Sequence, residues 1–507
     1  MGNKNIVLCS DGTGNRDIKA RGTNVFKLYE AVDIQGHKEN QSFKPQVAFY
    51  DDGVGSSSFL PVKIIGGAFG WGFSKNVRDL YTELVHVYQP GDSLYLFGFS
   101  RGAYTIRALA GMIQYCGIVD IAKVANKEQL ESRVKACWDQ FAAVVFKPFQ
   151  TDAVRRRNVP AAVDSAIAVE RRRALGAIAH PEHAPAGEPS IEFVGVWDTV
   201  AAVGAPFEEL RDLLNFFIPV KFAELVPGSR IKRACHALSI DDERQTFHPE
   251  LWNEQKARSG QIEQVWFAGA HSNVGGGYPK QGMSLVALDW MMAEAERCGL
   301  RFIPGDREFV KTHQDIHGTL YDSRAGLAVY YRWGPWNIVT LCRDHNIKLP
   351  KIHVSVFERI ANGTDGYAPG NIPFACEVVT TQSPTPGVSS PWPAQAALQA
   401  MKQAIVQPSP PPGGSLLDTV KRAIMSGKLA YYTFLGSTVL LFWWLCNPPL
   451  FLENAAGTLE PRVLVVGLFA LIGVIVLAWS HMVDGTLDAW YSRFWDVRRE
   501  RLRELLR

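Results

Sequence analysis

The sequence predicts an α/β fold, with a mostly parallel sheet and a helical insertion, followed by a C-terminal transmembrane helical hairpin. Three observations lead to this prediction. Strand-like and helix-like segments alternate through the first large section of the chain, which is typical of a parallel α/β sheet. A Gly-x-Ser-x-Gly motif lies between one of these strands and the next helix. Two apolar segments near the C-terminus are each long enough to cross a bilayer as a helix.

The predicted strands are short apolar runs that end in turns. The first is NIVLCS, which runs into the Gly-rich turn DGTGN, and PQVAFYDDGVGS near residue 46 repeats this design. After an amphipathic helix, KNVRDLYTELVHVY, the strand SLYLF leads to the motif, and the helix GAYTIRALAGMIQYCG follows it. Two later strands are SIEFVGVW and IEQVWFA. Near-continuous apolar strands of this kind suit a sheet that is covered on both faces.

Two stretches differ in composition from the sheet segments. Residues 119–188 are rich in Ala and Arg, have a helical pattern and end in Pro and Gly, so they predict an insertion over the sheet. This insertion is either a lid or a solvated excursion with no role at the site. Residues 380–416 hold runs of Pro, Ser and Gly that cannot bury enough surface to fold, and they predict a linker after a domain of residues 1–379.

The C-terminal part predicts a transmembrane hairpin within residues 417–485. Its spans, about 429–452 and 463–483, contain no Lys, Arg, Asp or Glu, and aromatic residues gather toward their ends. A buried core helix can be equally apolar, but two in tandem around a ten-residue connection favour the hairpin. Basic residues flank both outer ends, so the positive-inside rule places the large domain on the cytoplasmic side. The last segment, 486–507, is a predicted basic amphipathic helix that either lies on anionic headgroups or is solvated.

Charge and cysteine content argue against several classes of protein. The 53 basic and 50 acidic residues leave a formal net charge of +3, which gives no reason to expect a nucleic-acid partner. The eight cysteines are scattered, with no CxxC pair or close Cys/His cluster, so neither a structural zinc site nor a disulfide framework is expected. Free thiols in a reducing compartment fit this pattern better. The N-terminal apolar run is too short for a secretory signal peptide.

Ser100 is the candidate nucleophile of the motif. A serine hydroxyl reacts only when a base removes its proton and donors stabilise the oxyanion that forms. Gly98 and Gly102 allow a sharp turn that exposes Ser100 above the sheet, and the backbone N–H of Arg101 would point into the oxyanion site. The alternative is a small residue that fills a tight turn. No metal or cofactor is expected, because an oxyanion hole supplies the electrostatic stabilisation.

Candidate partners follow Ser100 in the order acid, then histidine, that such a site requires. Asp198 ends the strand in FVGVWDTV, where a carboxylate can orient an imidazole. Asp241 and Asp242, in a predicted loop before FHPELW, are the alternative acids. His271 comes just past a strand end in WFAGAHSNVGGGY and is the best placed base. The other candidates, whose contexts predict structural histidines, are His236, His248 and His353.

The turn SDGTGN after the first strand is the candidate source of a second oxyanion donor. The donor would be the backbone N–H of Gly12 or Thr13. Asp11 has the alternative role of holding the turn by bonding its own backbone. The turn lacks the lysine and hydroxyl of a phosphate-binding loop.

Seven motifs resemble, in the same order, those of a widespread α/β-hydrolase family that was long described only as a domain of unknown function and that includes type VI secretion lipase effectors. They are IVLCSDGTGN, QVAFYDDGVGS, PGDSLYLFGFSRGAYTIRALAG, FVGVWDTV, LSIDDERQTFHPELW, VWFAGAHSNVGGGY and IHVSVFERI. The resemblance covers about residues 5–375. It implies an α/β-hydrolase fold, a triad of Ser100, Asp198 and His271, and hydrolysis of phospholipid acyl esters of the phospholipase A type.

Together, the motifs and the apolar hairpin predict a membrane-anchored serine esterase. Its expected partners are a phospholipid or other acyl ester, the lipid bilayer and, by the resemblance, a secretion-system or immunity protein. The expected location is the bacterial inner membrane with a cytoplasmic catalytic domain, or a target cell to which the protein is delivered. Two alternatives remain: a membrane-inserted scaffold or toxin component whose hydrolase fold is not the active principle, and a carboxylesterase that cleaves another ester.

Overall fold

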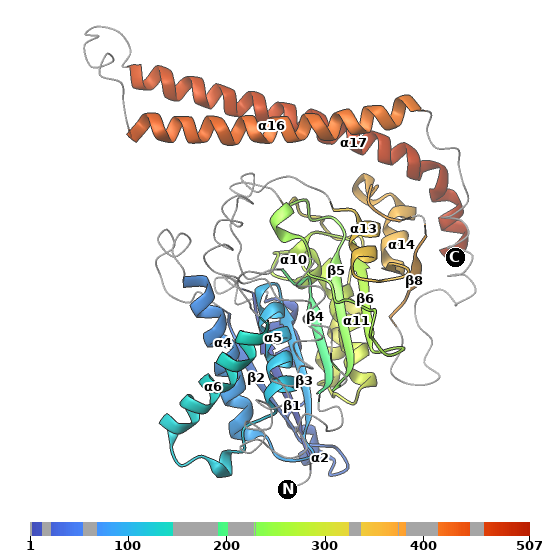
Figure 1. The fold of residues 1–507 in the computed structure, drawn as a ribbon. Coiled ribbons are helices and arrows are strands. Elements are labelled where there is room, and N and C mark those ends of the chain that lie inside the picture. Colours follow the sequence, from blue (N-terminus) through green and yellow to red (C-terminus); the bar gives the residue numbers. More distant parts are fainter. Residues whose placement is uncertain are drawn as a thin grey trace.

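A parallel β-sheet forms the centre of the molecule in the computed structural model (Figure 1). The structure describes residues 3–12, 22–53, 68–145, 191–200, 228, 230–323, 336–373, 375–381, 414–446 and 461–506. The described strands are β1 (Asn5–Ser10), β2 (Gln46–Asp51), β3 (Ser93–Phe99), β4 (Ile191–Trp197), β5 (Ile231–Ser239), β6 (Ile262–Phe267), β7 (Lys351–His353) and β8 (Glu377–Val379). Every neighbouring pair of these strands is parallel. The predicted parallel α/β fold is confirmed.

Helices cover both faces of this sheet. The longer ones are α1 (Asn24–Ala31), α4 (Ala68–Val87), α5 (Arg101–Cys116), α6 (Lys127–Val145), α11 (Gly282–Arg297), α12 (Pro304–His313) and α14 (Val354–Asn362). The shorter ones are α2 (Gly36–Glu39), η2 (Ile121–Lys123), η4 (Gln245–Phe247), α10 (His271–Gly275), α13 (Ile338–Asp344) and η6 (Thr364–Gly366). Ile6 and Leu8 of β1 pack with α4, α5 and α6, whereas Val7 and Cys9 pack with α1 and α11 on the other face. Alternate residues of one strand thus serve two cores.

The strand order places a switch point at β1. The sheet runs β2-β1-β3-β4-β5-β6-β7-β8, so the chain leaves β1 toward β2 and then returns to add β3 on the opposite side. In open parallel sheets, ligands bind outside the carboxyl ends of the strands at such a reversal. The carboxyl ends of β1 and β3 therefore mark the expected position of a site.

The predicted insertion begins as part of the core. Helix α6 packs against α4 and α5, and its Cys137 and Phe141 are buried in the cluster on that face of the sheet. The rest of the insertion or lid predicted at 119–188, residues 146–188, lies outside the described residues, as does most of the predicted linker at 380–416. The lid and the linker stay predictions.

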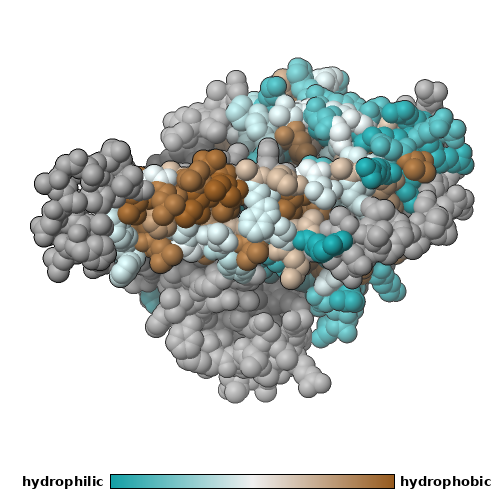
Figure 2. All heavy atoms as spheres, turned by 90° about the horizontal axis from the view of Figure 1, so that it is seen from above, coloured by the Kyte–Doolittle hydropathy of each residue, from teal (hydrophilic) through white to brown (hydrophobic). Residues whose placement is uncertain are grey.

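Two long helices, α16 (Gly414–Cys446) and α17 (Pro461–Leu506), lie side by side above the carboxyl ends of the strands (Figure 1). Among the described residues, one helix, Met425–Cys446, is long and apolar enough to cross a membrane, and α17 contains a shorter apolar stretch, Val465–Val476. Seen from above, brown side chains gather on the part of the hairpin that holds the end of α16 and the start of α17 (Figure 2). This part presents apolar side chains outward, including Leu440, Phe442, Leu468 and Leu471.

The last turns of α17 pack on the domain that holds the sheet. Trp495 and Leu502 are buried in a cluster with residues of α14, and the Trp495 indole donates to the Pro369 carbonyl at 2.9 Å. Arg499 and Arg503 donate to carbonyls in the last turn of α14, at 3.1 and 2.7 Å. The two guanidinium groups thus cap the end of α14 together with the Gly363 N–H, which also donates to the Ile360 carbonyl at 3.0 Å. The predicted tail is thus helical and amphipathic, and its apolar face covers the domain.

Candidate active site

Ser100 lies in a sharp turn between β3 and α5. Its φ of 57° and ψ of −122° are sparsely populated for a residue with a side chain. Such strain costs about 1–3 kcal/mol and persists only where the surroundings enforce it. The backbone N–H of Ser100 donates to the Trp197 carbonyl at 3.1 Å, which ties the turn to the end of β4. The predicted strand–turn–helix context of the motif is present, at the switch point of the sheet.

The two motif glycines are required by close backbone contacts. A Cβ on Gly102 would lie 2.1 Å from the Ser10 carbonyl oxygen at the end of β1. A Cβ on Gly98 would lie 2.6 Å from the Gly102 carbonyl oxygen. Backbone atoms cannot move away as a flexible side chain can, so the turn admits no side chain at either position.

Asp198 and His271 meet at the same edge of the sheet. Asp198 follows β4, is fully buried and has a φ of 38°, and His271 is the first residue of α10. The Asp198 Oδ2 atom lies 2.6 Å from Nδ1 of His271. Asp198 also accepts bonds from the backbone N–H and hydroxyl of Ser239, at 3.0 and 2.9 Å. These bonds hold the carboxylate in one orientation beside the imidazole.

Ser100 and His271 are connected through Phe99. The Phe99 ring lies against the His271 ring, with centroids 4.6 Å apart, and Phe247 packs on the imidazole edge-on at 5.1 Å. Phe99 also pairs with Trp197 across β3 and β4, so Ser100 and Asp198 follow paired residues. The three predicted residues thus follow β3, β4 and β6 at the same edge of the sheet, with β5 between β4 and β6.

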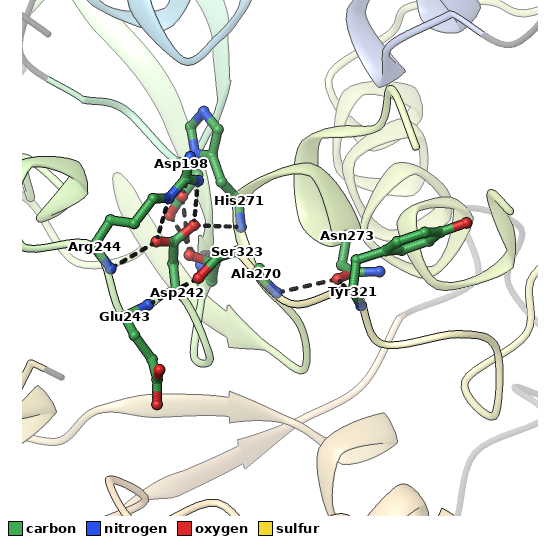
Figure 3. A network of polar contacts seen from close by, with 10 residues as sticks. Asp198, Asp242, Glu243, Arg244, Ala270, His271, Asn273, Tyr321 and Ser323 are labelled. Atoms are coloured by element: carbon green, nitrogen blue, oxygen red, sulfur yellow. Dashed lines mark hydrogen bonds and ion pairs between the residues drawn. The ribbon is translucent and has the colours of Figure 1, made fainter. Parts of the chain in front are cut away.

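Asp242 holds the backbone of His271 (Figure 3), and Asp241 holds that of Gly269 in the same loop. The Asp242 carboxylate accepts the backbone N–H of His271 at 3.2 Å and forms a two-point ion pair with Arg244. Asp241 accepts the backbone N–H of Gly269 at 2.6 Å. The carboxylate that contacts the imidazole ring is that of Asp198.

The turn after β1 is fixed by the Asp11 side chain. The backbone N–H of Gly12 donates to Asp11 Oδ1 at 2.6 Å, which is the self-bonding alternative that the sequence left open. Asp11 Oδ2 accepts the hydroxyls of Thr23 and Tyr50, at 2.5 and 2.6 Å. The Gly12 N–H is therefore directed at Asp11 in this structure, and Thr13 lies outside the described residues.

Arg101 is the first residue of α5. Its backbone N–H lies at the positive end of the helix dipole, where negative charge is stabilised. Among the described residues, no group of three or more His, Cys, Asp and Glu could hold a metal ion.

Two of the histidines set aside by the sequence have structural partners. His236 accepts the backbone N–H of Thr199 at 3.1 Å, next to Asp198. His353 contacts the hydroxyls of Ser355 and Thr381, at 2.8 and 3.2 Å. Sequence reasoning missed Ser239, the partner of Asp198, although a polar residue that ends an apolar strand just before two aspartates was a usable signal.

Known proteins resemble this chain in sequence. The family model described as "T6SS, Phospholipase effector Tle1-like, catalytic domain" matches residues 4–294, which run from β1 to α11 and include Ser100, Asp198 and His271. The uncharacterized protein YEL023C of Saccharomyces cerevisiae is 27% identical over 257 residues, which are 48% of this chain and 32% of that protein. The match thus covers about a third of that relative.

Two solved structures are similar at low sequence identity. An uncharacterized protein from Pseudomonas aeruginosa is 17% identical, with a TM-score of 0.35, over 81% of this chain and 60% of that one. A Tle1 effector bound to the VgrG spike of the type VI secretion system is 16% identical, with a TM-score of 0.30, over 65% of this chain and 78% of that one.

Proposed function

The chain belongs to the Tle1-like family of type VI secretion phospholipase effectors, and we propose that it is a serine hydrolase that cleaves acyl esters of phospholipids through Ser100, His271 and Asp198. The observation that carries the proposal is the 2.6 Å contact of Asp198 with His271, beside the strained turn that presents Ser100. These are the parts that an acyl-transfer site needs at the carboxyl edge of a parallel sheet.

The proposed reaction begins with attack of the Ser100 hydroxyl on the ester carbonyl. Asp198 accepts the Nδ1–H of His271, so Nε2 is the imidazole nitrogen that takes the serine proton. The tetrahedral oxyanion is stabilised by the backbone N–H of Arg101 at the start of α5. His271 then protonates the leaving alcohol, which leaves an acyl group on Ser100. Water, activated by the same imidazole, releases the fatty acid.

We further propose that α16 and α17 anchor the protein in a lipid bilayer. This is supported by the apolar helix Met425–Cys446 and by the outward-facing apolar side chains beside it. The basic residues outside both predicted spans favour a catalytic domain on the cytoplasmic side of the membrane. A membrane-bound site would meet phospholipids directly, which favours them over soluble esters. Family membership supports delivery to target cells and a partner in the secretion system.

The proposal is tested with labelled phospholipids in detergent, comparing the full chain with Ser100→Ala. We expect fatty-acid release by the wild type alone, with the position of the label showing which acyl bond is cut. A wild type that is inert on phospholipids but reacts with a fluorophosphonate probe would keep the serine chemistry and refute the substrate. If the folded wild type also fails to react with the probe, the hydrolase is refuted in favour of a membrane-inserted scaffold.

A further inference from the structure

The loop that carries His271 is short and conformationally restricted. β6 ends at Phe267 and α10 begins at His271, so residues 268–270 connect the strand to the histidine. Gly269 has a φ of 113°, and a Cβ there would lie 2.3 Å from the Asn273 Cβ. Only glycine adopts this conformation readily, so the path of the loop depends on what holds the Gly269 backbone.

Asp241 bonds both backbone polar groups of Gly269. Its carboxylate Oδ2 accepts the Gly269 N–H at 2.6 Å, and its own backbone N–H donates to the Gly269 carbonyl at 3.1 Å. The loop after β5 and the loop after β6 are thereby joined two residues before His271.

Tyr367 holds Asp241 in turn. The Tyr367 hydroxyl donates to Asp241 Oδ2 at 2.8 Å, and the tyrosine is 6% exposed. The guanidinium of Arg359 lies over its ring, 5.3 Å from the centroid, and Arg499 of α17 donates to its backbone carbonyl at 3.3 Å. A series of contacts therefore runs from the end of α17 through Tyr367 and Asp241 to the histidine loop.

The ionisation of Asp241 depends on the hydrogen bond from the Tyr367 hydroxyl. Burial raises the pKa of Asp241 to about 6, and the nearby charge of Asp242 acts in the same direction. The Gly269 N–H, the Tyr367 hydroxyl and the charge of Arg359 oppose burial by favouring the ionised form. An ionised carboxylate accepts the Gly269 N–H more strongly than a protonated one.

We propose that Tyr367 and Asp241 are positioning residues that fix His271 for catalysis by holding the backbone of Gly269. The inference rests on the proposed function, because it assigns these two residues a part in the reaction of that site. Both act through the loop and not on the ester.

The first test compares Tyr367→Phe with Tyr95→Phe in the full chain. Both changes remove one buried tyrosine hydroxyl, and Tyr95 bonds the Cys298 carbonyl at 2.6 Å, at a distance from the histidine loop. For Tyr367→Phe we expect about tenfold lower kcat on labelled phospholipid with KM little changed, since a 1 Å misplacement of a reacting group can cost about a hundredfold. Fluorophosphonate labelling should slow by the same factor, whereas Tyr95→Phe should match the wild type.

The second test follows kcat against pH. Losing the Tyr367 hydroxyl removes a bond that favours ionised Asp241, so its pKa rises and the acid limb of the Tyr367→Phe profile moves to higher pH. In an Asp241→Asn background no carboxyl titrates at position 241, and Tyr367→Phe should no longer shift the limb.

A Tyr367→Phe variant with kcat within twofold of the wild type and an unmoved acid limb would overturn this inference and leave the proposed function intact. Equal losses in both tyrosine variants would also overturn it, by showing a general effect on stability. A wild type that neither cleaves esters nor reacts with the probe would overturn both proposals.

Discussion

The aspartates around His271 differ in what their carboxylates hold. Asp198 contacts the imidazole at Nδ1, whereas Asp242 accepts the backbone N–H of the same residue and is neutralised by Arg244. A base needs a carboxylate at the nitrogen opposite the one that takes the proton. At the scale of single residues, the site therefore separates the orientation of the ring from the placement of its backbone.

This division predicts different effects for two conservative changes. Asp198→Asn should lower kcat by about 10⁴-fold, because an amide can hold the imidazole in the wrong tautomer, as in serine proteases. Asp242→Asn keeps an oxygen for the His271 N–H and should cost far less. The measurement is fatty-acid release with both variants checked for unchanged thermal unfolding. Equal losses would assign the orienting role to neither aspartate alone.

For single residues, the sequence predicted a role where the reactive residue type lies within a recognisable local pattern. The sharp turn at Ser100 was predictable, because its two glycines, its strand and its helix are contiguous in the chain. The contacts of Ser239 and Tyr367 were not, since they join residues that are 41 and 126 positions apart and that pattern analysis cannot pair.

At the scale of elements, α14 connects the sheet, the C-terminal helix and the site. Its N-cap is His353, whose ring accepts the Ser355 N–H, and its last turn holds the carbonyls that Arg499 and Arg503 contact. The His353 ring also stacks on Phe267, the last residue of β6, at a centroid distance of 4.8 Å. This histidine is fully buried.

Burial of His353 makes stability sensitive to acid. Burial lowers its pKa from an ordinary 6.5 to about 3, so the folded protein keeps the ring neutral while the unfolded chain binds a proton. Its contribution to stability is therefore complete above pH 6.5 and is lost as the pH falls toward 3. His353→Gln should flatten the fall of the melting temperature in this window.

The matched control is His313→Gln, which changes an exposed histidine of α12. Its melting temperature should follow the wild-type curve across the same pH range. A His353→Gln curve parallel to the wild type would contradict the assignment of a buried, neutral histidine at this position.

The strands and helices around the motifs could be predicted because the spacing of apolar residues in each segment is typical of a strand or of a helix. The position of α17 could not, because its arginines and apolar residues suit a lipid surface as well as a protein one. Trp495 and Leu502 are buried only because α14 offers a complementary apolar face, which requires knowledge of the fold.

At the scale of the whole molecule, α17 connects the apolar surface that it forms with α16 to the surface of α14. It is one helix of 46 residues, about 70 Å long at 1.5 Å per residue. One part packs beside α16 with apolar side chains facing outward, and its last turns cap α14. A bilayer that takes up the first part would therefore hold the catalytic domain close to its surface, with the carboxyl ends of the strands on the side of the hairpin (Figure 1).

A charge in the middle of the apolar helix tests this arrangement. Leu440 is 58% exposed and lies within Met425–Cys446, whereas Met425 is 71% exposed at its end. A lysine near the centre of a spanning helix costs about 2.5–3.5 kcal/mol, which corresponds to about a hundredfold weaker insertion. Leu440→Lys should therefore lose binding to phospholipid vesicles, while Met425→Lys, whose side chain can reach the headgroups, should bind nearly as the wild type does.

Assays with two substrates, vesicle phospholipid and a soluble ester, distinguish loss of membrane anchoring from loss of hydrolysis in the same variants. Hydrolysis of vesicle phospholipids should fall with binding in Leu440→Lys, and hydrolysis of a soluble ester should not change, because the proposed triad lies outside the hairpin. Vesicle hydrolysis that persists without binding would show that the site reaches lipid without the hairpin. Loss of both activities would instead show that the hairpin supports the fold of the site, as its contact with α14 and Tyr367 allows.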